Sequence, residues 1–206
     1  MNLALLSAFI PTFFFVSITP GMCMTLAMTL GMTIGVKRAL WMMLGELTGV
    51  ATVATLSAIG VAALLLNYPT AFSVLKAMGG LYLAYIGIQM WLSKGKMAIK
   101  AQEEGGVAAT SFELISQGFV TAIANPKGWA FFVALLPPFL DSSQPLASQL
   151  VVLIAIILCL EFTCLVIYAM GGRTLRSVLM KSGNVRIMNR VAGTLMIFVG
   201  GWLAIG

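Results

Sequence analysis

Six apolar stretches, each long enough to cross a lipid bilayer, constrain this chain more than any other feature of its sequence. A helix rises about 1.5 Å per residue, so about 20 apolar residues cross a hydrocarbon core of about 30 Å. The stretches cover residues 3–34, 40–66, 70–92, 113–139, 146–171 and 188–205. Their apolar runs are continuous and do not alternate, which favours helices over barrel strands. We therefore expect an all-α integral membrane protein with six transmembrane helices.

The composition excludes a soluble domain. Of the 206 residues, 60% are hydrophobic and 9% are charged, and the mean hydropathy is +1.03. A soluble fold of this size would have too much apolar surface to cover. The net charge of +6 does not indicate nucleic-acid binding, because the basic residues fall almost entirely between the apolar stretches. The first stretch has no basic flank or cleavage site, so we expect it to be a retained helix and not a signal peptide.

Positive charge predicts the orientation of the bundle. The connections after the first, third and fifth stretches hold ten Lys and Arg residues, against Lys76 alone on the opposite side. Lys127 belongs to neither side, because it lies inside the fourth stretch. Basic connections remain on the cytoplasmic side of a membrane. We therefore expect a multi-pass protein with both termini on the outer, periplasmic side.

The two halves of the sequence share an order of motifs. Each half has a proline in the middle of an apolar stretch, then an acidic residue, then two glycines separated by six residues. These are Thr19-Pro20-Gly21, Glu46-Leu47-Thr48 and Gly80 with Gly87, and then Asn125-Pro126-Lys127, Glu161-Phe162-Thr163 and Gly193 with Gly200. The matching positions are offset by 106, 115 and 113 residues. A chance match of a few residues is the alternative to a repeat.

The repeat predicts an inverted topology. Each half has three stretches, an odd number, so the second half must enter the membrane in the opposite sense. We expect one transmembrane transporter domain over residues 1–206. It comprises repeat one at about 1–93, a polar cytoplasmic linker at about 94–111 and repeat two at about 112–206. In such proteins the substrate binds where the halves meet.

Pro20 and Pro126 predict that the first and fourth transmembrane helices are broken. Proline lacks the N–H that a helix needs and clashes with the preceding turn. Breaks of this kind inside a membrane are the usual location of transporter binding sites, because they free backbone groups to bind a ligand. The alternative is an ordinary proline kink without a binding role.

Glu46 and Glu161 are the candidate proton carriers. They lie eight residues from Arg38 and twelve from Arg173, respectively, which places each about 12 to 18 Å inside the membrane. A charge at the centre of a lipid-facing helix costs about 2.5 kcal/mol or more, so both should face a cavity within the protein. The chain has no histidine. The alternative is that each glutamate snorkels or bonds a neighbouring helix.

Lys127 is the candidate anion-binding residue. It follows Pro126 directly and so stands in the first turn of the resumed helix, where its charge and the unpaired N–H groups attract a substrate carboxylate. The first break offers similar N–H groups, and Gly21 lets a ligand approach the backbone. We expect Asn125 and Gly128 to belong to the same substrate site. The alternative is that Lys127 forms a structural ion pair with one of the glutamates.

The cysteines and most glycines are expected to be structural. Cys23 lies three residues after Pro20, but the matching residue of the second half is Trp129, so a dithiol mechanism lacks its partner. Three cysteines inside apolar stretches give no disulfide framework and no metal-ligand spacing. We expect no cofactor and no metal. The glycine pairs fit close helix packing: Gly31 with Gly35, Gly45 with Gly49, and the two repeated pairs.

Together these motifs resemble the LysE/RhtB family of amino-acid exporters over essentially the whole chain. The resemblance rests on the Pro20-Gly21 break, Gly45-Glu46, Asn125-Pro126-Lys127 and the glycine-rich end at Gly200-Gly201. The family motif at the first break reads Pro-Gly-Pro followed by Asn or Asp, whereas this chain has Met22 and Cys23 there. The difference bears on the substrate, since it removes a polar side chain near the break.

The resemblance implies a bacterial inner-membrane efflux transporter that exports amino acids by proton antiport and is not an enzyme. Its partners would be an amino acid, protons and the lipid bilayer, with a homo-oligomer as a further possibility. Two alternatives remain open from the residues: cation efflux through the two glutamates, and a membrane thiol oxidoreductase that uses Cys23.

Overall fold

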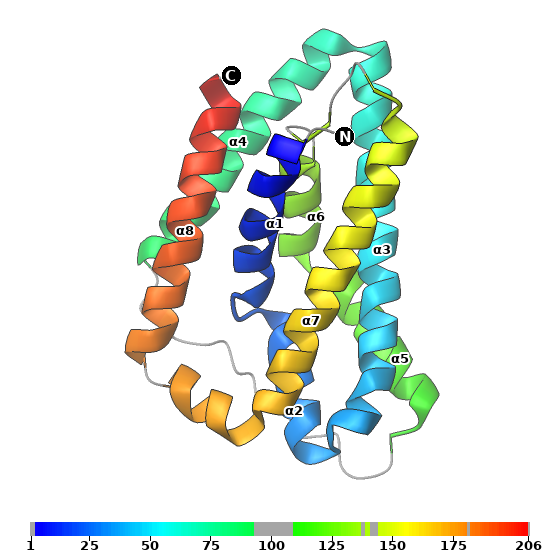
Figure 1. The fold of residues 1–206 in the computed structure, drawn as a ribbon, viewed down its shortest axis with the longest axis vertical. Helices are drawn as coiled ribbons and strands as arrows, with labels where there is room; N and C mark the ends of the chain where they lie inside the picture. The colour runs from blue at the N-terminus through cyan, green and yellow to red at the C-terminus, as the bar shows by residue number, and fades with distance from the viewer. Residues whose placement is uncertain (1–2, 93–108, 137–138, 141–143, 181, 206) are drawn as a thin grey trace.

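In the computed structural model, the described parts of the chain are entirely helical (Figure 1). The structure describes residues 3–92, 109–136, 139–140, 144–180 and 182–205. Most of the predicted 94–111 linker lies outside these residues. The helices are α1 (Leu3–Ile18), α2 (Met22–Thr33), α3 (Val36–Asn67), α4 (Pro69–Leu92), α5 (Ser111–Ile123), α6 (Pro126–Leu135), α7 (Leu146–Met180) and α8 (Ser182–Ile205).

Both predicted helix breaks are confirmed. The first stretch is divided into α1 and α2, which are bent by 57° at Thr19-Pro20-Gly21. The fourth is divided into α5 and α6, which begins at Pro126, a position where a missing N–H costs nothing. The last two stretches differ from expectation. Helix α7 continues beyond residue 171 through a kink at Gly172, and α8 begins at Ser182 instead of residue 188.

Helices of membrane-crossing length are present among the described residues. Val36–Gly60 and Leu146–Gly172 are long and apolar enough to cross a bilayer, and the bent pair Phe9–Ile18 with Met22–Thr33 makes a third span if counted as one. The start of the described part of α1 and the end of the described part of α8 lie at the same end of the molecule (Figure 1). The count of six spans and the inverted repeat remain predictions.

Glycines allow three pairs of helices to pack closely. A Cβ added to Gly87 of α4 would overlap the backbone of α8, and a Cβ added to Gly193 of α8 would overlap the backbone of α4. These two glycines therefore let α4 and α8 pack closely. Gly45 packs on the Ile115 carbonyl and joins α3 to α5, and Gly31 packs on Ala169 of α7. The packing role predicted for Gly35 is wrong. It has a φ of +83°, and no atom of the described residues lies within 4 Å of its Cβ position, so it serves the turn between α2 and α3.

Two buried clusters fill the interior. The aromatic cluster comprises Phe9, Phe13, Phe131, Phe132 and Phe139, with ring centroids 4.9 to 6.2 Å apart in the pairs that connect them to Phe9 or Phe13. The methionine-rich cluster combines Met24, Met28, Met42, Met43, Cys164 and Tyr168 with smaller apolar residues. The two clusters lie on either side of the helix breaks.

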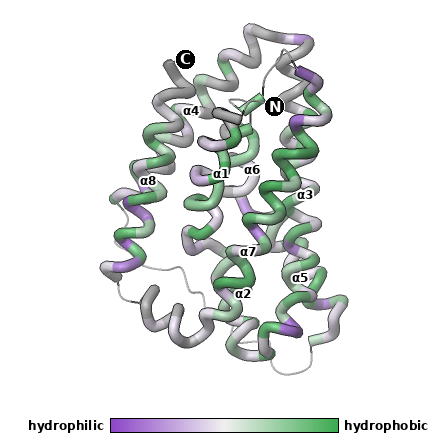
Figure 2. Tube along the Cα trace, viewed as in Figure 1, coloured by the Kyte–Doolittle hydropathy of each residue, from purple (hydrophilic) through white to green (hydrophobic). Residues whose placement is uncertain are grey.

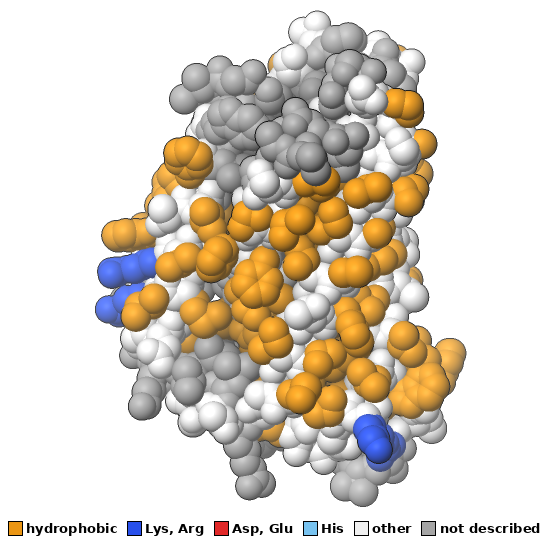
Figure 3. Space-filling model, in the orientation of Figure 1, with side chains coloured by type: hydrophobic (Ala, Val, Ile, Leu, Met, Phe, Trp, Pro, Cys, Tyr) orange, Lys and Arg blue, Asp and Glu red, His pale blue; other side chains and the backbone are white. Residues whose placement is uncertain are grey.

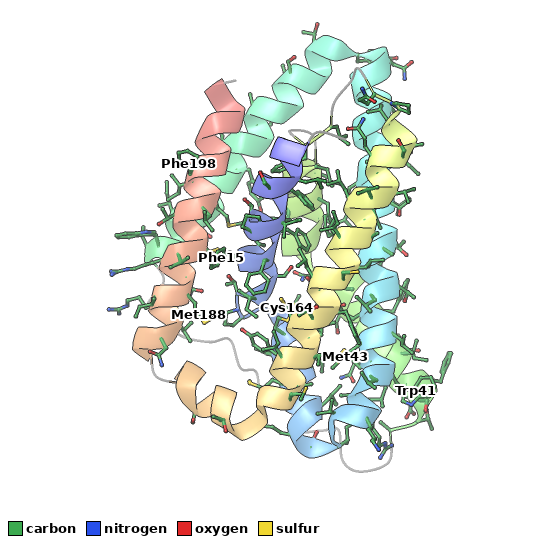
Figure 4. The ribbon with its side chains drawn as sticks, in the orientation of Figure 1. Phe15, Trp41, Met43, Cys164, Met188 and Phe198 are labelled. Atoms are coloured by element: carbon green, nitrogen blue, oxygen red, sulfur yellow. The ribbon has the colours of Figure 1, made fainter. Side chains whose placement is uncertain are left out.

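The outer surface suits a lipid environment. Much of the coloured part of the tube is hydrophobic (Figure 2), and apolar side chains cover the middle of the visible face, with Lys and Arg at its left edge and at its lower right (Figure 3). Phe198 and Trp41 project outward, 77% and 44% exposed, while Met43 and Cys164 point inward and are fully buried (Figure 4). Apolar side chains face outward as well as inward, as expected of a protein surrounded by lipid.

Candidate functional site

A cavity lies at the level of the two helix breaks, between the aromatic and methionine-rich clusters. Its volume is about 60 Å³, room for several water molecules. Polar and backbone groups come from both halves of the sequence: Ser17, Thr19, Gly21, Cys23, Glu46, Asn125, Gly128 and Glu161. Apolar side chains complete the wall: Phe13, Val16, Met22, Met24, Val50, Val53, Ala122, Phe131 and Phe132. Five of the six substrate-site residues predicted from sequence line this one cavity.

Glu46 is the most unusual group in the cavity wall. Helix α3 positions it with no exposed surface, and neither carboxyl oxygen meets a hydrogen-bond partner within the part of the chain that the structure describes. The groups that interact with it are the Glu161 carboxyl of α7, which repels its charge, and the Cys23 thiol, which is at most a weak hydrogen-bond donor. A buried ionised carboxylate without a partner costs several kcal/mol, so this site favours either a proton or a bound cation.

Glu161 of α7 contributes to the cavity wall from the second half of the chain. Its side chain is partly exposed, whereas that of Glu46 is fully buried. Two carboxyl groups that interact in one cavity disfavour simultaneous ionisation, because like charges repel strongly in a low dielectric. A single positive charge between them, whether a proton or an ammonium group, relieves that repulsion. The pair predicted from sequence is therefore brought together.

A polar contact joins the two helix breaks. The Asn125 side-chain amide donates to the Cys23 sulfur over 3.8 Å, a weak hydrogen bond between residues 102 positions apart. Asn125 precedes α6 and Cys23 stands in the first turn of α2, so the contact crosses from one half of the chain to the other. All three cysteines are free thiols. Among the described residues, no group of three His, Cys, Asp or Glu side chains is arranged to hold a metal ion.

The backbone of the two breaks differs in its free donors. Gly21, the N-cap residue of α2, is extended, with φ −139° and ψ −172°, and makes no side-chain cap. The first N–H groups of α2 lie at the cavity wall without a cap from this residue, where a helix dipole favours an anion. At the second break, the Gly128 N–H already donates to the Asn125 carbonyl over 3.0 Å. The first break is thus the better source of backbone donors.

The predicted role of Lys127 cannot be placed on this geometry. Its backbone lies in the first turn of α6, beside the cavity residue Gly128, as the sequence predicted. Its side chain lies outside the described part of the structure. Neither anion binding nor the alternative ion pair with a glutamate is tested, so the role stays a prediction.

Two features of the site were not predicted from the sequence. One is the set of apolar wall residues, above all the phenylalanines that α1 and α6 contribute from the aromatic cluster. The other is Tyr168, whose hydroxyl donates to the Ile18 carbonyl at the end of α1 over 2.7 Å. Tyr168 lies seven residues after Glu161 and therefore on the same face of α7. This spacing is the sequence signal that could have placed Tyr168 in the interior.

Comparisons with known proteins agree with the membrane character of the chain. A family model described as "LysE type translocator" matches residues 14–206. A homoserine/homoserine lactone efflux protein of Salmonella typhimurium is 25% identical over 96% of this chain and 94% of its own. A leucine efflux protein of Klebsiella pneumoniae is 24% identical over 90% and 87%. An uncharacterized membrane protein of Vibrio cholerae is 28% identical over 99% and 98%. No solved structure gives a significant match.

Proposed function

The chain belongs to the LysE type translocator family, which makes it a membrane transporter and not an enzyme, and we propose that it exports amino acids in exchange for protons. The observation that carries the proposal is Glu46, fully buried and without a hydrogen-bond partner among the described residues, at a cavity between two broken helices. Relatives named for homoserine and leucine efflux support an amino-acid substrate.

The two ends of an amino acid would bind to different parts of the cavity. The substrate ammonium occupies the position between Glu46 and Glu161, where it supplies the missing positive charge. The substrate carboxylate faces the uncapped N–H groups after Gly21 and the charge of Lys127. Asn125 and Gly128 line the same cavity and would shape the second break around the substrate backbone.

Antiport would follow from competition for one negative site. A carboxylate that holds the substrate ammonium has no need of a proton, and a protonated carboxyl no longer attracts an ammonium. Loading the substrate therefore releases a proton, and loading a proton releases the substrate. Access alternates as the two halves of the chain move against each other, as in other transporters with broken helices.

The apolar wall would select the substrate side chain. Phenylalanine and valine side chains surround the polar groups, and Lys127, the one basic residue proposed for the site, is assigned to the backbone carboxylate of the substrate. Short or branched aliphatic side chains fit this lining, whereas aspartate and glutamate would bury an unpaired charge. The family motif has a polar residue at the first break where this chain has Met22 and Cys23. The loss of that polar group also favours a substrate with an apolar side chain.

Export measurements across the twenty amino acids and homoserine, in cells that overproduce this protein, test the proposal. We expect extracellular accumulation of neutral aliphatic amino acids above that of cells with an empty vector, and none of aspartate or glutamate. Efflux of an inorganic cation without any amino acid would favour the cation alternative. Unchanged export after Cys23→Ser would exclude a thiol reaction as the basis of transport.

We further propose a bacterial inner-membrane location with six spans and both termini in the periplasm. The ten-to-one distribution of basic residues and the shared end of α1 and α8 support this orientation. Tags at either terminus should be accessible to impermeant reagents in intact spheroplasts, while a tag within residues 94–111 should react only after lysis. A terminus that is accessible only after lysis would contradict the orientation.

A further inference from the structure

The first helix break needs several substitute hydrogen bonds. Helix α1 ends at Ile18, and Pro20 has no N–H to offer the preceding turn. Thr19 satisfies two of the carbonyls that are left: its hydroxyl donates to Phe15 over 2.7 Å and its N–H to Val16 over 3.3 Å. The Ile18 carbonyl is instead satisfied by the Tyr168 hydroxyl, 150 residues away on α7.

The second break is satisfied differently. The Asn125 N–H donates to the Ala122 carbonyl over 3.2 Å, and the indole N–H of Trp129 donates to the Ile123 carbonyl over 2.9 Å. Each of these donors belongs to the same half of the chain as its acceptor. When the halves move relative to each other, the Trp129 bond travels with its break. The Tyr168 bond joins one half to the other, so such a movement can separate its donor from its acceptor.

The position of Tyr168 identifies the side of the cavity that this bond closes. Tyr168 is 1% exposed within the methionine-rich cluster, about 10 Å beyond Glu161 in the direction of the Gly172 kink of α7 and of Arg173, which follows it. By the distribution of basic residues this is the cytoplasmic side. Cys164, one turn earlier on the same helix, is fully buried in the same cluster.

We propose that the Tyr168 hydroxyl is a positioning group that holds the first helix break against α7 and keeps the cavity closed on its cytoplasmic side. The proposal rests on the proposed transport function and on the orientation predicted from charge. The bond forms in the closed conformation and is absent when the cytoplasmic path opens. Trp129, the local donor of the other break, has no such dependence on conformation.

Labelling of the native Cys164 thiol measures this closure directly. An impermeant maleimide is applied to right-side-out and to inside-out vesicles, and peptide mass spectrometry separates the label on Cys164 from that on Cys23 and Cys159. Wild type should label slowly from either face. Tyr168→Phe removes one buried hydrogen bond and should accelerate labelling roughly five- to tenfold, from the cytoplasmic face alone. Trp129→Phe, the matched control, should label as slowly as wild type.

Transport gives a second measurement. For substrate presented at the cytoplasmic face, Tyr168→Phe should lower the apparent KM, because a larger fraction of the protein is open to load, while kcat does not rise. Wild-type labelling in Tyr168→Phe, an equal increase in Trp129→Phe, or faster labelling from both faces would overturn the proposed role of Tyr168. A lower kcat with an unchanged KM would also overturn it. Absence of any amino-acid transport by wild type would refute the proposed function, while labelling still decides the proposed role of Tyr168.

Discussion

Replacing Glu46 with glutamine is expected to abolish substrate-induced proton movement in reconstituted vesicles. The carboxyl group is fully buried at the cavity, without a described hydrogen-bond partner, and interacts with Glu161. An amide is permanently neutral, so it cannot take up a proton when the substrate leaves. Proton movement should fall to the level of protein-free vesicles, and accumulation of substrate against a gradient should stop.

Downhill exchange of one amino acid for another should survive in Glu46→Gln. The amide oxygen still accepts a hydrogen bond from the substrate ammonium, but without a charge. Hydrogen bonds to charged groups contribute about 1 to 1.5 kcal/mol more than neutral ones, so the apparent affinity should weaken roughly tenfold. Glu161→Gln is the matched control. Glu161 is less enclosed, and we expect it to retain part of the coupling. Full coupling in both variants would contradict the carboxylate mechanism.

The helix breaks and the buried glutamate could be predicted from sequence because their causes are local. Pro20 and Pro126 each remove an N–H from the middle of an apolar stretch, and a helix ends beside each of them. Pro11 lies inside α1 without ending it, so a proline marks a candidate break that its neighbours decide. Glu46 is a charge within an apolar stretch, and the high cost of lipid exposure leaves a protein cavity as its place. Neither inference required knowledge of which helices touch.

The contacts that complete the cavity could not be predicted, because they depend on the packing of distant helices. Tyr168 reaches Ile18 across 150 residues, and nothing near either residue specifies the other. The aromatic cluster also forms only when α1 meets α6. A phenylalanine in an apolar stretch has the same composition signal whether it faces lipid or a cavity, so sequence did not separate Phe13 from its outward neighbours.

Glycine spacing illustrates the same limit. Gly31 with Gly35 and Gly45 with Gly49 have identical separations, and both pairs were predicted to pack against helices. Gly45 and Gly49 do so on α5, but Gly35 adopts a positive φ at a turn, with no atom of the described residues within 4 Å of its Cβ position. Backbone conformation and the identity of the neighbouring helix decide between these roles, and a four-residue spacing specifies neither.

Lys127→Met is expected to reduce export roughly a hundredfold while leaving membrane insertion intact. Lys127 is the second residue of α6 and precedes the cavity residue Gly128, where its charge and the helix dipole would both attract a carboxylate. Methionine keeps the length and removes the charge. The loss of a charged hydrogen bond costs about 2 to 3 kcal/mol, which corresponds to that reduction. Export from cells and the amount of protein in the membrane fraction are measured together.

Two further variants separate the charge of Lys127 from its shape and from charge in general. Lys127→Arg should also be impaired, because a planar guanidinium does not replace a compact ammonium in a tight site. Lys37→Met removes an exposed positive charge at the start of α3 and should export normally. Near-normal export by Lys127→Met would reduce Lys127 to a structural residue and leave the uncapped N–H groups of α2 as the only proposed partner of the substrate carboxylate.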